Sequence, residues 1–146
     1  MPFAVGLALA LSAVTGQTAA VASTIQMPPP QAQTVQEYVA SYFADIPVMA
    51  DIARCESQYR QFDKDGSVHR GVVNHADVGI MQINEFYHGD VAKKMGLDLY
   101  TLDGNVSYAR SLYEKEGVTP WNSSKPCWGK TVAAKAEARK EIALNK

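Results

Sequence analysis

The sequence predicts an α+β fold that is mostly α-helical and carries one small β-hairpin. Four segments between residues 34 and 117 have helical character, and three of them place apolar side chains at the three- and four-residue spacing of a buried helix face. Between the second and third segments, residues 63–83 combine a DKDG turn signal with two short β-prone stretches. The length of 146 residues fits one domain.

The first two helices are predicted over residues 34–44 and 47–59. The first segment gathers its apolar side chains on one face, namely Val35, Tyr38, Val39, Tyr42 and Phe43. The two helices are separated by Asp45, which can cap a helix, and by Pro47, which suits a first helical turn.

The hairpin is predicted to pair residues 67–74 (SVHRGVVN) with residues 77–83 (DVGIMQI). A third helix is expected to follow directly over residues 84–96, because Gly96 is a typical helix end. The hairpin therefore sits as a small insertion between helices.

The fourth helix is predicted over residues 101–117. Thr101 or Asp103 can cap its beginning, and Gly117 can end it. Its predicted buried face consists of Val106, Ala109, Leu112 and Tyr113.

Composition and charge narrow the class of protein. Hydrophobic residues make up 47% and charged residues 20% of the chain, which is ordinary for a soluble globular protein. The net charge of −1 argues against a nucleic-acid-binding protein, because such proteins depend on basic contacts to phosphates. We expect a monomer with no nucleic-acid partner and no cofactor.

The first 22 residues predict a secretory signal peptide. They contain no charged side chain, their most apolar run is too short to span a bilayer, and they end in the cleavable pattern Ala-Val-Ala. No Lys or Arg precedes the apolar run, so an uncleaved anchor, a misassigned start or a core helix are alternatives. With cleavage we expect an exported protein, extracellular, periplasmic or cell-wall associated, without stable membrane insertion.

The remaining chain divides into three parts. Residues 23–33 are expected to form an extended linker, because three consecutive prolines forbid a helix. A compact domain is expected over residues 34–128. Residues 129–146 form a basic tail whose alanines favour a solvated helix or a frayed end, and adhesion to an anionic surface is a weaker alternative.

The chain has two cysteines, Cys55 and Cys127. In an exported protein, two cysteines far apart in sequence suggest one disulfide. Two free buried thiols are the alternative, and it gains weight if the protein is not exported.

Two carboxylates are candidates for acid–base chemistry. Glu56 shares a helix face with Met49, Ile52 and Ala53, so burial and the helix dipole should raise the pKa of its carboxyl and make it a proton donor. Asp77, on a short polar strand, is expected to stay charged. Such a pair is what glycoside cleavage needs, although a glutamate at a helix end more often pairs with an arginine, and Arg54 and Arg60 are close by.

The motifs around these carboxylates resemble those of the lysozyme superfamily, both c-type lysozymes and the soluble lytic transglycosylase domain. The similar features are CES at residues 55–57, DVGIMQIN at residues 77–84, Asn105 in a later helix, and a Pro-Trp pair followed by a cysteine. The resemblance covers about residues 48–128 and implies a lysozyme-like fold with the hairpin beside the catalytic helix. These enzymes are themselves the standard example of paired carboxylates, so the two arguments are not independent.

The resemblance also implies roles for individual residues. Glu56 matches the general acid and Asp77 the second carboxylate, while Cys55 and Cys127 resemble a bridge from the catalytic helix to the C-terminal part. Substrate binding is implied for Ser57, Gly79, Met81, Gln82, Asn84, Tyr108 and Trp121, with Gly79 letting sugar and backbone approach closely. Structural roles remain alternatives for Asp77 (a turn), for Tyr108, and for Gln82 and Asn84 (hairpin backbone contacts).

The implied activity is cleavage of peptidoglycan glycan strands at the β-1,4 bond between N-acetylmuramic acid and N-acetylglucosamine. A lytic transglycosylase-type reaction is slightly favoured over lysozyme-type hydrolysis, and a non-catalytic wall-binding protein on the same scaffold is the alternative from another class. No metal is expected, because the spacing of His69, His75 and His88 fits no usual ligand pattern.

Overall fold

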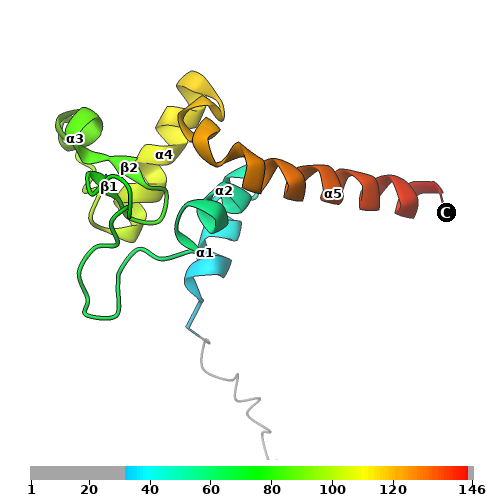
Figure 1. Cartoon of the computed structure of the whole chain (residues 1–146), viewed down its shortest axis with the longest axis horizontal. Coiled ribbons are helices and arrows are strands. Elements are labelled where there is room, and N and C mark those ends of the chain that lie inside the picture. Colours follow the sequence, from blue (N-terminus) through cyan, green and yellow to red (C-terminus); the bar gives the residue numbers. More distant parts are fainter. Residues whose placement is uncertain (1–31, 145–146) are drawn as a thin grey trace, which may run out of the picture. The chain divides into compact units, whose positions relative to one another are not determined.

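The computed structural model describes residues 32–144 (Figure 1). The predicted signal peptide and most of the predicted linker lie outside the described residues. No helix within residues 32–144 is both long enough and apolar enough to cross a membrane. In chain order the elements are α1 (Val35–Tyr42), α2 (Val48–Ser57), β1 (Asp77–Val78), β2 (Ile83–Asn84), α3 (Glu85–Lys94), α4 (Leu102–Glu116), the 3-10 helix η1 (Thr119–Ser124) and α5 (Lys125–Leu144). The predicted class, α+β and mostly α, is confirmed.

Helix α1 begins with a complete capping box. The Thr34 hydroxyl accepts from the Glu37 amide at 3.2 Å, and the Glu37 carboxylate accepts from the Thr34 amide at 2.8 Å. The predicted apolar face is only partly buried, since Val39 and Phe43 are fully enclosed whereas Val35 is exposed. Helix α1 thus covers one side of the core with its C-terminal half.

The start of α2 differs from the prediction. Pro47 itself is the N-cap, and the Asp45 side chain does not cap the helix. Asp45 instead accepts two hydrogen bonds from the Arg110 guanidinium of α4, at 2.8 and 2.9 Å. Asp45 therefore ties the connection between α1 and α2 to α4 rather than capping α2.

Helix α2 ends at Ser57, where the backbone turns sharply. Gln58 and Tyr59 have φ angles of 57° and 62°, in the left-handed region that costs a non-glycine residue about 1 kcal/mol or more. This turn sends the chain back toward the hairpin, where the buried Gln61 makes hydrogen bonds described below.

The hairpin is shorter than predicted. Strands β1 and β2 pair antiparallel, with Asp77 opposite Asn84 and Val78 opposite Ile83. Residues 79–82, which we call the GIMQ loop, form the turn between them, because Gly79 and Gln82 have positive φ angles of 72° and 50°. The predicted first strand, residues 67–74, forms only isolated bridges, so both strands of the observed hairpin come from residues 77–84.

Helices α3 and α4 agree with their predicted ranges. The Asn84 side chain caps α3 by accepting from the Tyr87 amide at 3.3 Å, and the Thr101 hydroxyl caps α4 by accepting from the Gly104 amide at 3.1 Å. The predicted buried face of α4 is largely confirmed, since Val106, Ala109 and Leu112 are buried and Tyr113 is partly buried. The core also takes in the aromatic and aliphatic side chains Phe43, Met49, Ile52, Val78, Ile80, Met81, Ile83, Leu99, Trp121 and Trp128.

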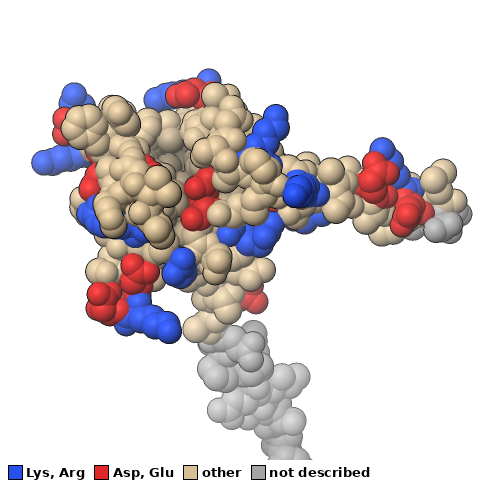
Figure 2. Space-filling view, viewed as in Figure 1, with Lys and Arg blue, Asp and Glu red and all other residues tan. Residues whose placement is uncertain are grey.

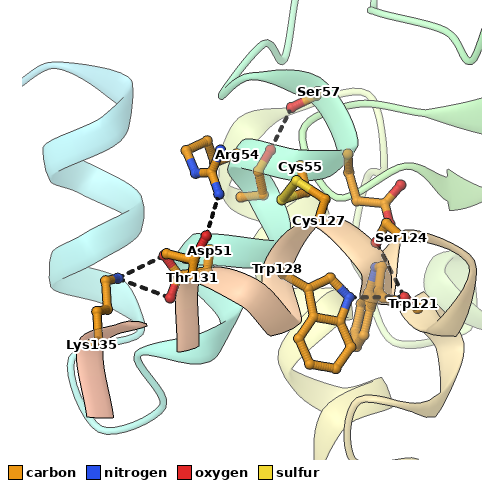
Figure 3. Close-up of a disulfide and its surroundings, with 12 residues drawn as sticks. Asp51, Arg54, Cys55, Ser57, Trp121, Ser124, Cys127, Trp128, Thr131 and Lys135 are labelled. Carbon is orange, nitrogen blue, oxygen red and sulfur yellow. Dashed lines mark hydrogen bonds and ion pairs between the residues drawn. A yellow bond between two sulfur atoms is a disulfide. The ribbon is translucent and has the colours of Figure 1, made fainter. Parts of the chain in front are cut away.

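Helix α5 is anchored to α2 at three points (Figure 3). Cys127 forms a disulfide with Cys55, with a Cα–Cα distance of 6.0 Å, which confirms the predicted pair and rules out two free thiols. Thr131 accepts from Arg54 at 2.7 Å, and Lys135 pairs with the buried Asp51 at 2.7 and 2.9 Å. The helix therefore starts before the predicted tail, and the first half of the tail is docked while residues 136–144 are exposed.

Candidate active site

A cavity of about 150 Å³ brings the two candidate carboxylates together. Glu56 enters from the end of α2 and Asp77 from β1. The remaining lining residues come from the hairpin, α3, α4 and η1, and they are Gln82, Ile83, Asn84, His88, Leu112, Pro120, Trp121 and Ser123. In Figure 2 acidic side chains lie close together near the middle of the face in view, with mostly uncharged side chains around them.

Glu56 is half-buried, and its surroundings favour the protonated form. Burial is the largest cause and raises the pKa of the Glu56 carboxyl above its usual value of 4.5. Ser124 opposes this by donating to Glu56 Oε1 at 2.6 Å, while the charge of Asp77 raises the pKa further. The raised pKa agrees with the sequence-based prediction.

The arginine pairing considered from the sequence does not occur. Arg54 donates to Thr131, and the Arg60 Nε donates to the Ser57 carbonyl at 2.9 Å. Glu56 is therefore held by a neutral hydroxyl, which leaves it able to keep or to lose a proton.

Asp77 is fixed by side-chain amides. Its Oδ1 accepts from the Asn84 side chain across the hairpin at 2.7 Å and from the Asn74 side chain at 3.3 Å. Both amides donate to the same oxygen, so the Asp77 side chain is held in place by the hairpin and the turn before it.

The GIMQ loop is held by buried amide side chains from two directions. Gln61 Oε1 accepts from the Ile80 amide at 2.9 Å. Asn105, fully buried on α4, accepts from the Met81 amide at 2.9 Å and donates to the Val78 carbonyl at 3.0 Å. These contacts satisfy the polar backbone groups that a non-extended loop would otherwise bury without partners.

Two further side chains bind the same loop. The Ser57 hydroxyl donates to the Ile80 carbonyl at 2.8 Å, and the Trp121 indole N–H donates to the Met81 carbonyl at 2.9 Å. Ser57 directly follows Glu56, so its hydrogen bond connects the end of α2 to the hairpin. The relative placement of Glu56 and Asp77 follows from these contacts.

Gly79 is required by this packing. Its φ is 72°, and a Cβ atom there would lie 2.4 Å from Asn105 Nδ2 and 2.7 Å from Gln61 Oε1. From the sequence, Gly79 was expected to let a sugar approach the backbone closely. In the structure, the position that a Cβ atom would take is occupied by the side-chain amides of Asn105 and Gln61.

The predicted binding residues fall into two groups. Gln82, Asn84 and Trp121 line the cavity together with the two carboxylates. The other four are buried and do not line this cavity, namely Ser57, Gly79, Met81 and Tyr108, so their predicted contact with substrate stays a prediction. The structural alternative for Gln82 also has support, since its amide donates to the Gly79 carbonyl at 2.8 Å.

Two residues at the site were not singled out from the sequence as site residues. His88 lines the cavity from α3, and its Nδ1 lies 3.0 Å from the Tyr108 hydroxyl, so Tyr108 reaches the cavity through it. His88 is four residues after Asn84, one helical turn, and that spacing was a usable signal. Ser124, the hydrogen-bond partner of Glu56, had no signal because its position depends on folding of residues 117–127.

A larger cavity, about 640 Å³, lies between α3 and residues 97–100. Its Glu85 pairs with Arg70 at 2.6 Å and accepts from the Tyr100 hydroxyl, and both contacts lower the pKa of that carboxyl, Arg70 more strongly. Such a glutamate is a poor proton donor. The smaller cavity, lined by a carboxyl with a raised pKa and by a second carboxyl group, is therefore the better candidate for acid–base chemistry.

The site can donate a proton to a bound group and stabilise positive charge beside it. Among the described residues, no group of three or more His, Cys, Asp or Glu side chains is arranged to hold a metal ion.

No protein-family model, curated protein or solved structure matches this chain. The case for function therefore comes from the site geometry and from the motifs that form it.

Proposed function

We propose that this chain has a lysozyme-like fold and is an exported enzyme that cleaves peptidoglycan by a lytic transglycosylase-type reaction. The observation that carries the proposal is Glu56, a carboxyl with a raised pKa that shares one cavity with Asp77. The disulfide supports export, because such bonds persist mainly in oxidising compartments. The substrate is the β-1,4 bond between N-acetylmuramic acid and N-acetylglucosamine.

In the proposed reaction Glu56 first acts as a general acid. It gives its proton to the glycosidic oxygen as the bond to the muramic acid C1 breaks, and the sugar acquires oxocarbenium character. The sugar's own acetamido group and the negative charge of Asp77 stabilise that positive charge. Glu56, now a carboxylate, then accepts the proton of the sugar's 6-hydroxyl as its oxygen attacks C1, which gives a 1,6-anhydro product.

A second candidate is a lysozyme-type hydrolase, which one observation favours. Asp77 lies close enough to Glu56 for its charge to raise the Glu56 pKa, as a second catalytic carboxylate would. In that case water attacks the sugar and the product is a reducing-end muramic acid. A non-catalytic wall-binding protein is less consistent with the site, because such a protein has no need of a proton donor in a cavity.

Replacing the proposed acid tests the proposal. Glu56→Gln should fold normally and lose nearly all cell-wall lysis in a turbidity assay, because an amide cannot donate an equivalent proton. Glu114→Gln, an exposed glutamate on α4, is the matched control and should keep full activity. A folded Glu56→Gln variant that lyses walls at the wild-type rate would rule out the mechanism.

Product analysis together with the Asp77→Asn variant distinguishes the lytic transglycosylase-type reaction from lysozyme-type hydrolysis. If the acetamido group provides most of the stabilisation, the variant should keep much of its activity and mass spectrometry should find 1,6-anhydromuramic acid. If Asp77 is the nucleophile or ion-pair partner, its loss should cost several kcal/mol, hence orders of magnitude in rate. Reducing-end products together with an inactive variant would make the protein a hydrolase.

A further inference from the structure

We infer that Ser124 is a positioning residue whose hydroxyl reverses its hydrogen bond with Glu56, so that one carboxyl can serve first as an acid and then as a base. The inference rests on the proposed function, in which Glu56 gives up a proton and takes one back. Its evidence is the hydrogen-bond arrangement around Ser124, which provides a partner for each protonation state.

The Ser124 hydroxyl lies between two acceptors. Its Oγ is 2.6 Å from Glu56 Oε1 and 3.1 Å from the Trp121 carbonyl oxygen. A hydroxyl has one proton to donate and two lone pairs that accept, so it cannot donate to both acceptors at once. Its orientation must follow the protonation state of Glu56.

Each state has a complete arrangement. When Glu56 is ionised, Ser124 donates to it, and this charge-assisted hydrogen bond stabilises the carboxylate. When Glu56 is protonated, its O–H can donate to the Ser124 oxygen while Ser124 donates to the Trp121 carbonyl. Between the two arrangements Glu56 gains or loses its own proton and the Ser124 hydroxyl proton changes direction, while the heavy atoms are already within hydrogen-bond distance in both.

The Trp121 carbonyl lowers the free-energy cost of reorienting the Ser124 hydroxyl. It also accepts from the Trp128 indole N–H at 3.0 Å, so it keeps a partner when Ser124 turns toward Glu56. An acceptor left without any partner in this buried region would instead penalise the ionised state. Figure 3 shows Trp128 beside Trp121 and Ser124, next to the disulfide.

The backbone keeps Ser124 opposite Glu56. Cys55 directly precedes Glu56, and Cys127 is three residues after Ser124, so the disulfide ties together the two segments that carry the hydrogen bond. Trp121 is fixed in turn by its hydrogen bond to the Met81 carbonyl. Ser124 therefore stays close to Glu56 without depending on substrate.

Other titratable groups at the cavity are Asp77 from β1 and His88 from α3. No Lys or Arg lines it, and the basic neighbour of Ser124 in the chain, Lys125, is exposed. Helix α4 contributes only Leu112 and η1 only uncharged side chains. Asp77 and His88 are unchanged in a Ser124 variant, so a change in Glu56 titration between variants reports on the hydroxyl.

The test compares Ser124→Ala and Ser124→Thr with the wild type. One measurement is the pH dependence of kcat on purified soluble glycan strands, and the other is NMR titration of the Glu56 carboxyl in the substrate-free protein. Ser124→Ala should lower kcat about tenfold with little change in KM, and should move the alkaline limb of the profile and the carboxyl titration to higher pH by about one pH unit. Ser124→Thr, which keeps the hydroxyl, should restore both.

Asn122→Ala is the control for general disturbance of η1, because Asn122 is exposed in the same element. An alanine variant whose Glu56 titration and alkaline limb match the wild type would overturn the inference, as would a threonine variant that restores neither or a control that shifts both equally. If the wild type cleaves no glycan, the proposed function fails, and the inferred acid–base role fails with it. The NMR comparison then still shows whether Ser124 and Glu56 are coupled.

Discussion

Asn105 offers the sharpest test of how the site is built. Its side chain is fully buried and makes three hydrogen bonds: it accepts from the Met81 amide at 2.9 Å and donates to the Val78 and Leu99 carbonyls at 3.0 and 2.9 Å. Asn105→Ala removes all three. The Leu99 carbonyl keeps a partner in Gln61 at 3.3 Å and Val78 stays paired with Ile83 across the hairpin, so the Met81 amide alone is left without a partner.

The magnitude follows from the three lost contacts. The unpartnered Met81 amide costs about 1–3 kcal/mol and each lost hydrogen bond to a carbonyl that keeps another partner costs about 0.5–1.5 kcal/mol, so the variant should lose roughly 2–6 kcal/mol of unfolding free energy. For a domain of this size each kcal/mol corresponds to roughly 4 °C, so the melting temperature should fall by about 10 °C or more. Asn105→Asp keeps the acceptor for Met81 but turns a carboxylate toward two carbonyls, and should be at least as damaging.

Thermal unfolding followed by circular dichroism measures the effect. Asn122→Ala removes an asparagine from an exposed position and should leave the melting temperature within about 2 °C, since surface substitutions usually change little. If Asn105→Ala melts within a few degrees of the wild type, the buried amide does not hold the GIMQ loop in the way described here, and the placement of Asp77 needs another cause.

Two further predictions concern stability. Reducing the Cys55–Cys127 disulfide opens a loop with a sequence separation of 72 and should remove about 4 kcal/mol of unfolding free energy. Thermal unfolding with and without reductant measures this loss. Reactive thiols in the untreated protein would contradict the prediction. Burial raises the pKa of Glu56 above its usual value of 4.5, so the folded protein binds this proton more tightly than the unfolded chain does. The stability that comes from this difference is present at low pH and is lost as the pH rises through the folded-state pKa. Glu56→Gln should therefore melt higher than the wild type at pH 7 and equally near pH 3, and an advantage that does not grow with pH would refute the assignment.

The helices could be predicted because their signals are local. The cap at Thr101 and the end at Gly117 depend on residues a few positions apart, and both occur where the sequence predicts them. Asp45 shows the limit of such signals, since it does not cap α2 as expected but pairs with Arg110, which is 65 residues away. A local sequence pattern contains no information about a partner that distant.

The hairpin was harder to predict because its conformation is decided by distant side chains. β-prone residues at 67–74 suggested a strand, but the observed strands are two residues each, and the GIMQ loop follows Gln61 and Asn105 rather than strand propensity. Strand propensity describes how well a residue fits a pleated surface, and residues 67–74 pair with their neighbours only at the isolated bridges Phe62–Val68 and Arg70–Val78.

The candidate site was predicted in part for a similar reason. The motif positions identified Glu56, Asp77, Gln82, Asn84 and Trp121, which the structure brings to one cavity. A motif does not say which side chains point into a cavity and which are buried, and the motif residues Ser57, Gly79, Met81 and Tyr108 are buried outside the cavity lining. Whether these residues bind a glycan is a question for the experiments above.

The fixation of the GIMQ loop has a consequence for the order of folding. A hairpin with two-residue strands is too short to persist alone, and its partners lie far along the chain: Ser57 contacts Ile80 across 23 residues, Asn105 reaches Met81 across 24, and Trp121 reaches Met81 across 40. On a growing chain the hairpin must therefore wait for α4 and η1 to be synthesised. We expect the cavity to be among the last parts to form, so a chain released before Trp121 would carry Glu56 and Asp77 without bringing them together.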